Sequence, residues 1–93
     1  FYIEKDNMKL IFRTDLEDYS MYSSFSKIQS ELPTNFIRCH KSYIVNVNNI
    51  KNIDNNIIHF DKTNTKQCYI GQVYKKNFLE VLKHESYTNT YGT

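Results

Sequence analysis

The stretch from Phe36 to Ile50 carries the side chains best suited to bind a charged ligand. It begins as a β-type run, is interrupted by the polar corner His40-Lys41-Ser42, and then resumes as a second β-type run. Loops that rigid strands hold in place often present binding groups to a ligand. No Asp or Glu occurs anywhere in this stretch, so no neighbour in the sequence neutralises the basic corner.

The side chains around this corner have two possible roles each. Arg38 and His40 occupy alternating positions of one predicted strand and therefore point to the same side. Arg38 either holds the corner by donating to backbone carbonyls or an acid, or it contacts a phosphate. His40 either shapes the loop through a local hydrogen bond or contacts a phosphate itself. Lys41 and Ser42 offer an ammonium and a hydroxyl at the tip.

Two further stretches extend this polar, basic set. One follows the first predicted turn, and the other follows the last predicted strand, where residues 62–76 include four lysines and no acid. Lysines neutralise phosphates, whereas Asn, Gln and Arg can read base edges. The candidate DNA-binding residues are Asn7, Lys9, Arg38, His40, Lys41, Ser42, Gln72, Tyr74, Lys75 and Lys76. The alternative is that scattered lysines only make an all-β surface soluble.

Other chemistry is poorly supported by the sequence. Cys39, His40, His59 and Cys68 have suitable ligand atoms for zinc, but their spacing matches no Cys-x-x-Cys or His-x-x-x-His motif. No glycine-rich oxyanion or phosphate-binding turn is present, because the chain has only two glycines. We therefore expect no metal, no cofactor and no catalytic residues.

The two cysteines suggest a separate hypothesis. Cys39 and Cys68 each lie on a predicted strand that leads to a basic tip. If those strands are neighbours, oxidation could join the two thiols and distort the DNA-facing loops. The alternative is a pair of inert, buried thiols in a reduced, cytoplasmic protein.

Composition and charge are consistent with one small, mostly β domain. The 93 residues are 40% hydrophobic and 15% aromatic. Residues 1–32 contain four basic and six acidic residues, a net charge of −2, whereas residues 33–93 contain eight basic and four acidic residues, a net charge of +4. A basic second part suits a polyanionic partner. No apolar run approaches 18 residues, so no membrane span is expected.

Hydrophobic alternation predicts strands over residues 1–4, 8–13, 18–22, 36–39, 43–46, 50–54, 57–61 and 66–70. In the second of these, Met8, Leu10 and Phe12 share one face. A short helix capped by Ser23 or Ser24 is expected before Pro33, with Phe25, Ile28 and Leu32 as its apolar stripe. A second short helix starts near Gln72, with Val73, Phe78, Val81 and Leu82 as its apolar positions. The fold class is therefore mostly β, with one or two short helices.

The predicted domain covers residues 1–85. The polar stretch 86–93 lacks an apolar pattern and is expected to be a flexible C-terminal tail. The chain opens abruptly on strand-like residues, so we expect N-terminal strands to be missing.

The pattern Phe36-x-Arg38-x-His40-Lys41-Ser42-Tyr43-x-Val45-Asn46, followed by Ile50, resembles the signature of the LytTR family. These domains are the all-β DNA-binding outputs of bacterial response regulators. A weaker resemblance extends over most of the chain. It implies stacked antiparallel β-sheets in an elongated β-β-β sandwich. It also implies loops that enter successive major grooves, and a central corner over the intervening minor groove.

The resemblance also implies partners. Family members bind paired direct repeats in promoter DNA, follow a receiver domain, and can occupy tandem sites as two copies. The family's loop positions fall on Lys9, on Lys41, and near Gln72 and Val73, which implies the same docking with a different target sequence. Two rivals stay open from the residues alone: a protein-interaction β-domain that does not bind DNA, and a single-stranded nucleic-acid binder that uses exposed Tyr faces.

Overall fold

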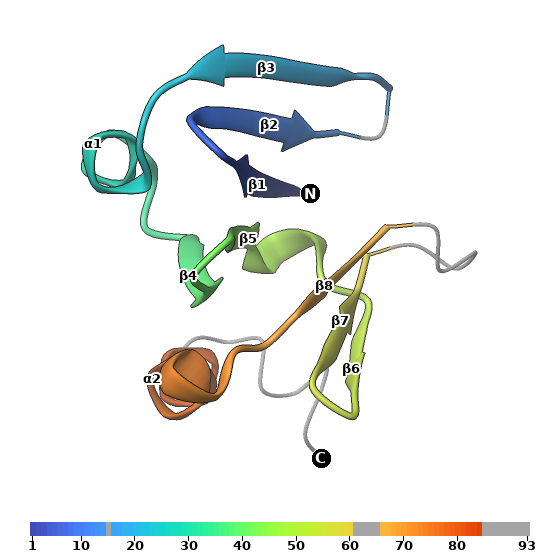
Figure 1. Ribbon diagram of the computed structural model, residues 1–93. Helices are drawn as coiled ribbons and strands as arrows, with labels where there is room; N and C mark the ends of the chain where they lie inside the picture. The colour runs from blue at the N-terminus through green and yellow to red at the C-terminus, as the bar shows by residue number, and fades with distance from the viewer. Residues whose placement is uncertain (15, 61–65, 85–93) are drawn as a thin grey trace.

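The computed structural model describes residues 1–14, 16–60 and 66–84. This part of the chain forms eight strands in two antiparallel sheets, together with two α-helices and one 3₁₀ turn (Figure 1). The mostly β prediction is therefore confirmed. The strands are β1 (Tyr2–Asp6), β2 (Lys9–Arg13), β3 (Asp18–Tyr22), β4 (Phe36–His40), β5 (Tyr43–Asn46), β6 (Asn52–Asp54), β7 (Ile57–His59) and β8 (Gln67–Tyr69). The helices are α1 (Phe25–Gln29), the 3₁₀ helix η1 (Val47–Asn49) and α2 (Gln72–His84).

The first sheet has the strand order β3-β2-β1-β5-β4. Strand β1 lies between β2 and β5, with Ile3 opposite Phe12 on one side and Ile44 on the other. The β1–β2 reversal takes only two residues, because Asn7 adopts a left-handed φ of 63° that Asn tolerates well. Strand β5 pairs with β1 on one side and with β4 on the other. It therefore joins the N-terminal meander to β4, although β1 and β5 are far apart in the sequence.

The second sheet is the meander β6-β7-β8. Asn55 and Asn56 have φ values of 51° and 65°, which are the left-handed angles that a two-residue hairpin needs. The hairpin predicted from this Asn pair is confirmed, although β6 begins at Asn52 rather than at Ile50. The predicted turn at residues 63–65 lies outside the described residues, as does the predicted tail at 86–93.

Helix α1 begins where the sequence predicted. The Ser24 side chain accepts a hydrogen bond from the Lys27 N–H, which satisfies one of the free donors of the first turn. The helix ends at Gln29, earlier than Pro33. The N–H groups of Glu31 and Leu32 then donate to carbonyls three positions back, which is the tighter 3₁₀ pattern.

Two clusters of buried side chains cover opposite faces of the first sheet at β5. Ile44 packs with Ile3, Leu10 and helix α1, whereas its neighbour Val45 packs into the larger cluster that includes Phe78 of α2. Successive strand residues point to opposite faces, so both faces of the sheet are buried here. None of the described helices is long and apolar enough to cross a membrane.

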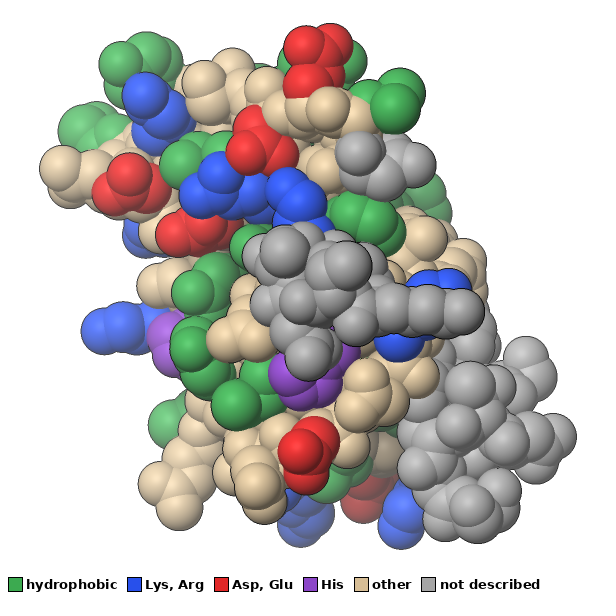
Figure 2. Space-filling model, turned by 90° about the vertical axis from the view of Figure 1, so that its right-hand side faces the viewer, with side chains coloured by type: hydrophobic (Ala, Val, Ile, Leu, Met, Phe, Trp, Pro, Cys, Tyr) green, Lys and Arg blue, Asp and Glu red, His purple; other side chains and the backbone are tan. Residues whose placement is uncertain are grey.

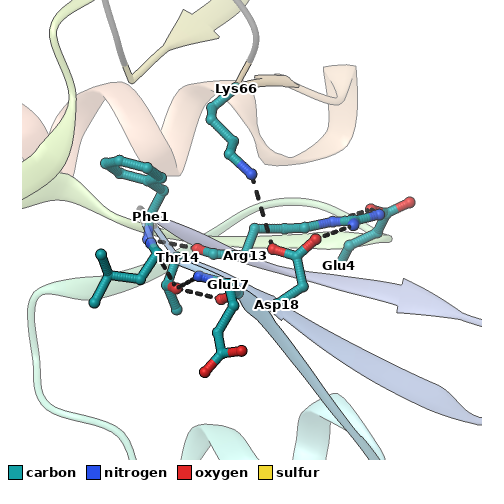
Figure 3. A network of polar contacts seen from close by, with 8 residues as sticks. Phe1, Glu4, Arg13, Thr14, Glu17, Asp18 and Lys66 are labelled. Carbon is teal, nitrogen blue, oxygen red and sulfur yellow. Dashed lines mark hydrogen bonds and ion pairs between the residues drawn. The ribbon is translucent and has the colours of Figure 1, made fainter.

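A network of ion pairs joins β1, β2 and β3 of the first sheet (Figure 3). Arg13 on β2 contacts Glu4 of β1 at 2.8 Å and Asp18 of β3 at 2.7 Å. Lys66, just before β8, lies 3.8 Å from the Asp18 carboxylate, so the network also reaches the second sheet. On the face shown in Figure 2, acidic and basic side chains lie next to one another rather than in a patch of one sign.

This network predicts a pH effect. The guanidinium of Arg13 donates to Asp18 and lowers the pKa of that carboxyl below its ordinary value. A lowered pKa stabilises the fold above the ordinary carboxyl pKa, and this contribution is lost as the pH falls through the lowered value. We expect Arg13→Gln to move the pKa of Asp18 upward, measured by an NMR pH titration of its carboxyl carbon. An unchanged Asp18 titration would contradict the role assigned to Arg13.

Candidate nucleic-acid interface

Three chain reversals that are distant in sequence lie together. They are the β1–β2 turn at Asn7, the β4–β5 turn at Lys41, and the start of α2 at Gln72. The Lys5 N–H donates to the Ser42 carbonyl at 2.8 Å, which ties the first reversal to the second. The Gly71 N–H donates to the Cys39 carbonyl at 2.7 Å, which ties the second to the third. The β1–β2 turn and α2 both lie toward the left of the view in Figure 1.

The β4–β5 turn exposes Lys41 to solvent, and Arg38 stabilises this turn through hydrogen bonds to its carbonyls. The Arg38 guanidinium donates to the carbonyl of Lys41 at 2.8 Å and to the carbonyl of His40 at 3.3 Å. It also lies over the rings of Phe25, at 4.9 Å, and Tyr74, at 5.3 Å. Arg38 thus makes the carbonyl contacts considered for its structural role. These contacts connect α1, the turn and α2.

His40 also takes part in the turn. Its Nδ1 accepts a hydrogen bond from the Ser42 N–H at 3.0 Å, and its ring lies 5.2 Å from that of Tyr43. A Cβ at Gly71 would come within 3.2 Å of the His40 ring, so the small residue gives the imidazole its space. This hydrogen bond uses Nδ1 as an acceptor, which leaves Nε2 to carry the proton of a neutral imidazole.

The β1–β2 turn differs from the sequence expectation. Met8 was predicted to belong to the second strand and to share one face with Leu10, but it precedes β2 and is 76% exposed, whereas Leu10 is fully buried. The left-handed φ of Asn7 moves Met8 out of the strand and onto the tip. Lys9 is half-buried, and its Nζ lies 6.0 Å from the ring centre of Tyr22.

At the start of α2, one side chain packs against β4 and its neighbours are exposed to solvent. Tyr74 is half-buried against Arg38, whereas Gln72, Lys75 and Lys76 are exposed. Val73 belongs to the apolar pattern that predicted this helix, but its side chain is 89% exposed. A shallow groove lies between this helix end and the β4–β5 turn. Its lining residues are His40, Lys41, Gly71, Gln72, Val73 and Tyr74.

Lys41, Lys75 and Lys76 on this surface form no ion pair with another described residue. Among the described residues, the ion pairs involve Arg13, Lys66 and their acids, and none involves Lys41, Lys75 or Lys76. Exposed ammonium groups without a carboxylate partner can neutralise phosphates without first breaking an ion pair. This surface is therefore suited to a polyanion.

Both cysteines are buried and reduced. Cys39 and Cys68 are fully enclosed in the larger core cluster, and the Cys39 thiol donates to the Tyr69 carbonyl at 3.6 Å. Burial raises the pKa of Cys39 to about 12 and also raises the pKa of Cys68. A raised pKa disfavours the thiolate that oxidation requires. Their redox pairing stays a hypothesis. Within the described part of the chain, no cluster of three His, Cys, Asp or Glu side chains is arranged to hold a metal.

The structure is a small, mostly β domain that presents loops on one surface. The family model described as LytTr DNA-binding domain matches residues 1–83, and the chain belongs to this family. A solved structure described as the LytTr DNA-binding domain of a putative methyl-accepting/DNA response regulator from Bacillus cereus is similar. Its TM-score is 0.74 at 29% identity, over 87% of this chain and 78% of that one. A search of curated proteins found no match.

Proposed function

We propose that this chain is the output domain of a two-component response regulator, and that it binds double-stranded promoter DNA sequence-specifically to control transcription. The observation that carries the proposal is the Lys41 tip. It is exposed, has no acidic partner among the described residues, and is held beside the start of α2. The family match supports the DNA partner, and the description of the Bacillus cereus neighbour supports the regulatory setting.

In this mechanism, charge brings the domain to DNA and the loops then read it. Lys41, Lys75 and Lys76 neutralise backbone phosphates, which supplies affinity for any sequence. The amides of Asn7 and Gln72 sit exposed at the outer two reversals, where paired donors and acceptors can meet base edges. Lys9, His40, Ser42 and Tyr74 lie beside these residues and complete the proposed contact surface.

The proposal extends to the full-length regulator, its partners and its location. We expect a receiver domain in the full regulator, two copies on tandem direct repeats, and a cytoplasmic location. No catalytic step is assigned to this chain.

A selection from random duplexes by gel shift tests the proposal. We expect enrichment of a defined sequence, bound more tightly than a scrambled duplex and more tightly than either of its single strands. Equal binding to single strands would favour a single-strand binder. Absence of salt-dependent binding to any nucleic acid would favour a protein-interaction domain and would contradict the proposal.

Replacing Lys41 with alanine should weaken binding to specific and scrambled duplexes alike, because its ammonium neutralises a phosphate. The slope of log K against log salt should become shallower by about 0.9, the value for one phosphate contact. Fluorescence anisotropy over a salt series measures this slope. Lys51→Ala is the matched control, since Lys51 is equally exposed but lies beside the second sheet. An unchanged slope for Lys41→Ala would remove Lys41 from the interface.

A further inference from the structure

Two exposed apolar side chains occupy the outer reversals of the interface. Met8 at the β1–β2 turn is 76% exposed, and Val73 at the start of α2 is 89% exposed. Both positions fit the hydrophobic periodicity of their elements, yet neither side chain enters the core. Each lies beside a cation: Lys9 follows Met8 in the chain, and Lys41 lines the groove that Val73 also lines.

The chemistry of the major groove supplies a partner for such side chains. Thymine is the base that presents a methyl group there, and apolar side chains contact it. Single exposed hydrophobic residues are common on protein surfaces and need no special explanation. Here, however, the two residues flank the cationic tip on the surface that faces the DNA in the proposed function. A Met side chain also adapts its shape easily to an irregular apolar surface.

We propose that Met8 and Val73 each contact a thymine 5-methyl group in the major groove, and that these contacts set part of the target sequence. This inference rests on the proposed function, and it adds a class of base contact that the polar residues cannot make. It predicts that the selected duplex contains thymine at one position under each outer reversal.

Replacing thymine by deoxyuridine tests the contact, because the change removes the methyl group and keeps every hydrogen-bonding group of the base. Starting from the selected duplex, each thymine is replaced singly and affinity is measured by anisotropy at fixed salt. We expect a loss of about fourfold at two positions, the factor for burying one methyl-sized group. The remaining thymines should change affinity by less than about twofold.

Variants assign each methyl to a residue. In Met8→Ala, deoxyuridine at one of the two positions should no longer weaken binding, and Val73→Ala should lose the effect at the other. Leu16→Ala is the matched control, because Leu16 is 90% exposed but lies beyond the opposite end of β2. That variant should keep both effects.

The outcomes separate this inference from the proposed function. Sequence-specific binding that is indifferent to deoxyuridine would overturn the inference and leave the proposed function standing. Deoxyuridine effects that persist in both alanine variants would overturn it too, since they would arise from DNA shape rather than from these side chains. Failure to bind any duplex would overturn the proposed function, and the inference with it.

Discussion

Replacing Phe78 with alanine should destabilise the domain by about 3–5 kcal/mol. Phe78 on α2 is fully buried in the larger core cluster, which also contains Val45 and Phe60, so truncation leaves a cavity there. A domain of this size has about 5–14 kcal/mol of stability in total, so the change removes a large share. Urea unfolding followed by circular dichroism measures the loss as a lower midpoint.

The same change should also affect DNA binding, because α2 carries Gln72 and the adjoining lysines. Phe78→Leu keeps most of the volume and should cost less than about 2 kcal/mol. Val73→Ala, on the exposed side of the same helix, should change stability by less than about 0.5 kcal/mol. A midpoint for Phe78→Ala that equals the Val73→Ala midpoint would show that α2 does not anchor on this core.

Replacing Arg38 with alanine should weaken DNA binding about tenfold, a factor that equals about 1.4 kcal/mol, while leaving the salt slope unchanged. The reason is that Arg38 holds the carbonyls of His40 and Lys41. Without it, the turn has to become ordered on binding, which costs affinity, but Lys41 still reaches its phosphate in the complex. We also expect about 2 kcal/mol of lost stability, since hydrogen bonds from a charged donor and its ring contacts disappear. Anisotropy over a salt series and urea unfolding provide both numbers.

The salt slope separates the two roles considered for Arg38. A positioning residue changes affinity at every salt concentration by the same factor, whereas a phosphate contact makes the slope shallower by about 0.9. Arg38→Lys provides the second discrimination. A lysine keeps the charge but cannot reproduce the planar fork that reaches both carbonyls. If Arg38→Lys binds DNA with the affinity of the unchanged protein, Arg38 contacts a phosphate rather than holding the turn in place.

Local chemistry in the sequence was sufficient for most elements of the fold. The bounds of β3 and β5, the Ser24 cap and the Asn55-Asn56 hairpin agree with the sequence prediction. These features depend on neighbours a few residues away, through alternation, capping and left-handed φ angles. Met8 and Val73 fit the hydrophobic periodicity and are nevertheless exposed, because periodicity continues to the end of an element even where no neighbouring element covers its terminal residues.

The sequence by itself determined that a basic corner without acids exists at Lys41, because charge and turn chemistry are local properties. Tertiary structure alone decided that this corner lies beside Lys5 of β1 and beside residues 72–73. It also decided that Arg38 is enclosed by Phe25 and Tyr74, and that both thiols are buried. These outcomes depend on the order of strands in the sheet and on which face each helix covers. Such long-range packing is set by the whole core rather than by any single stretch of the chain.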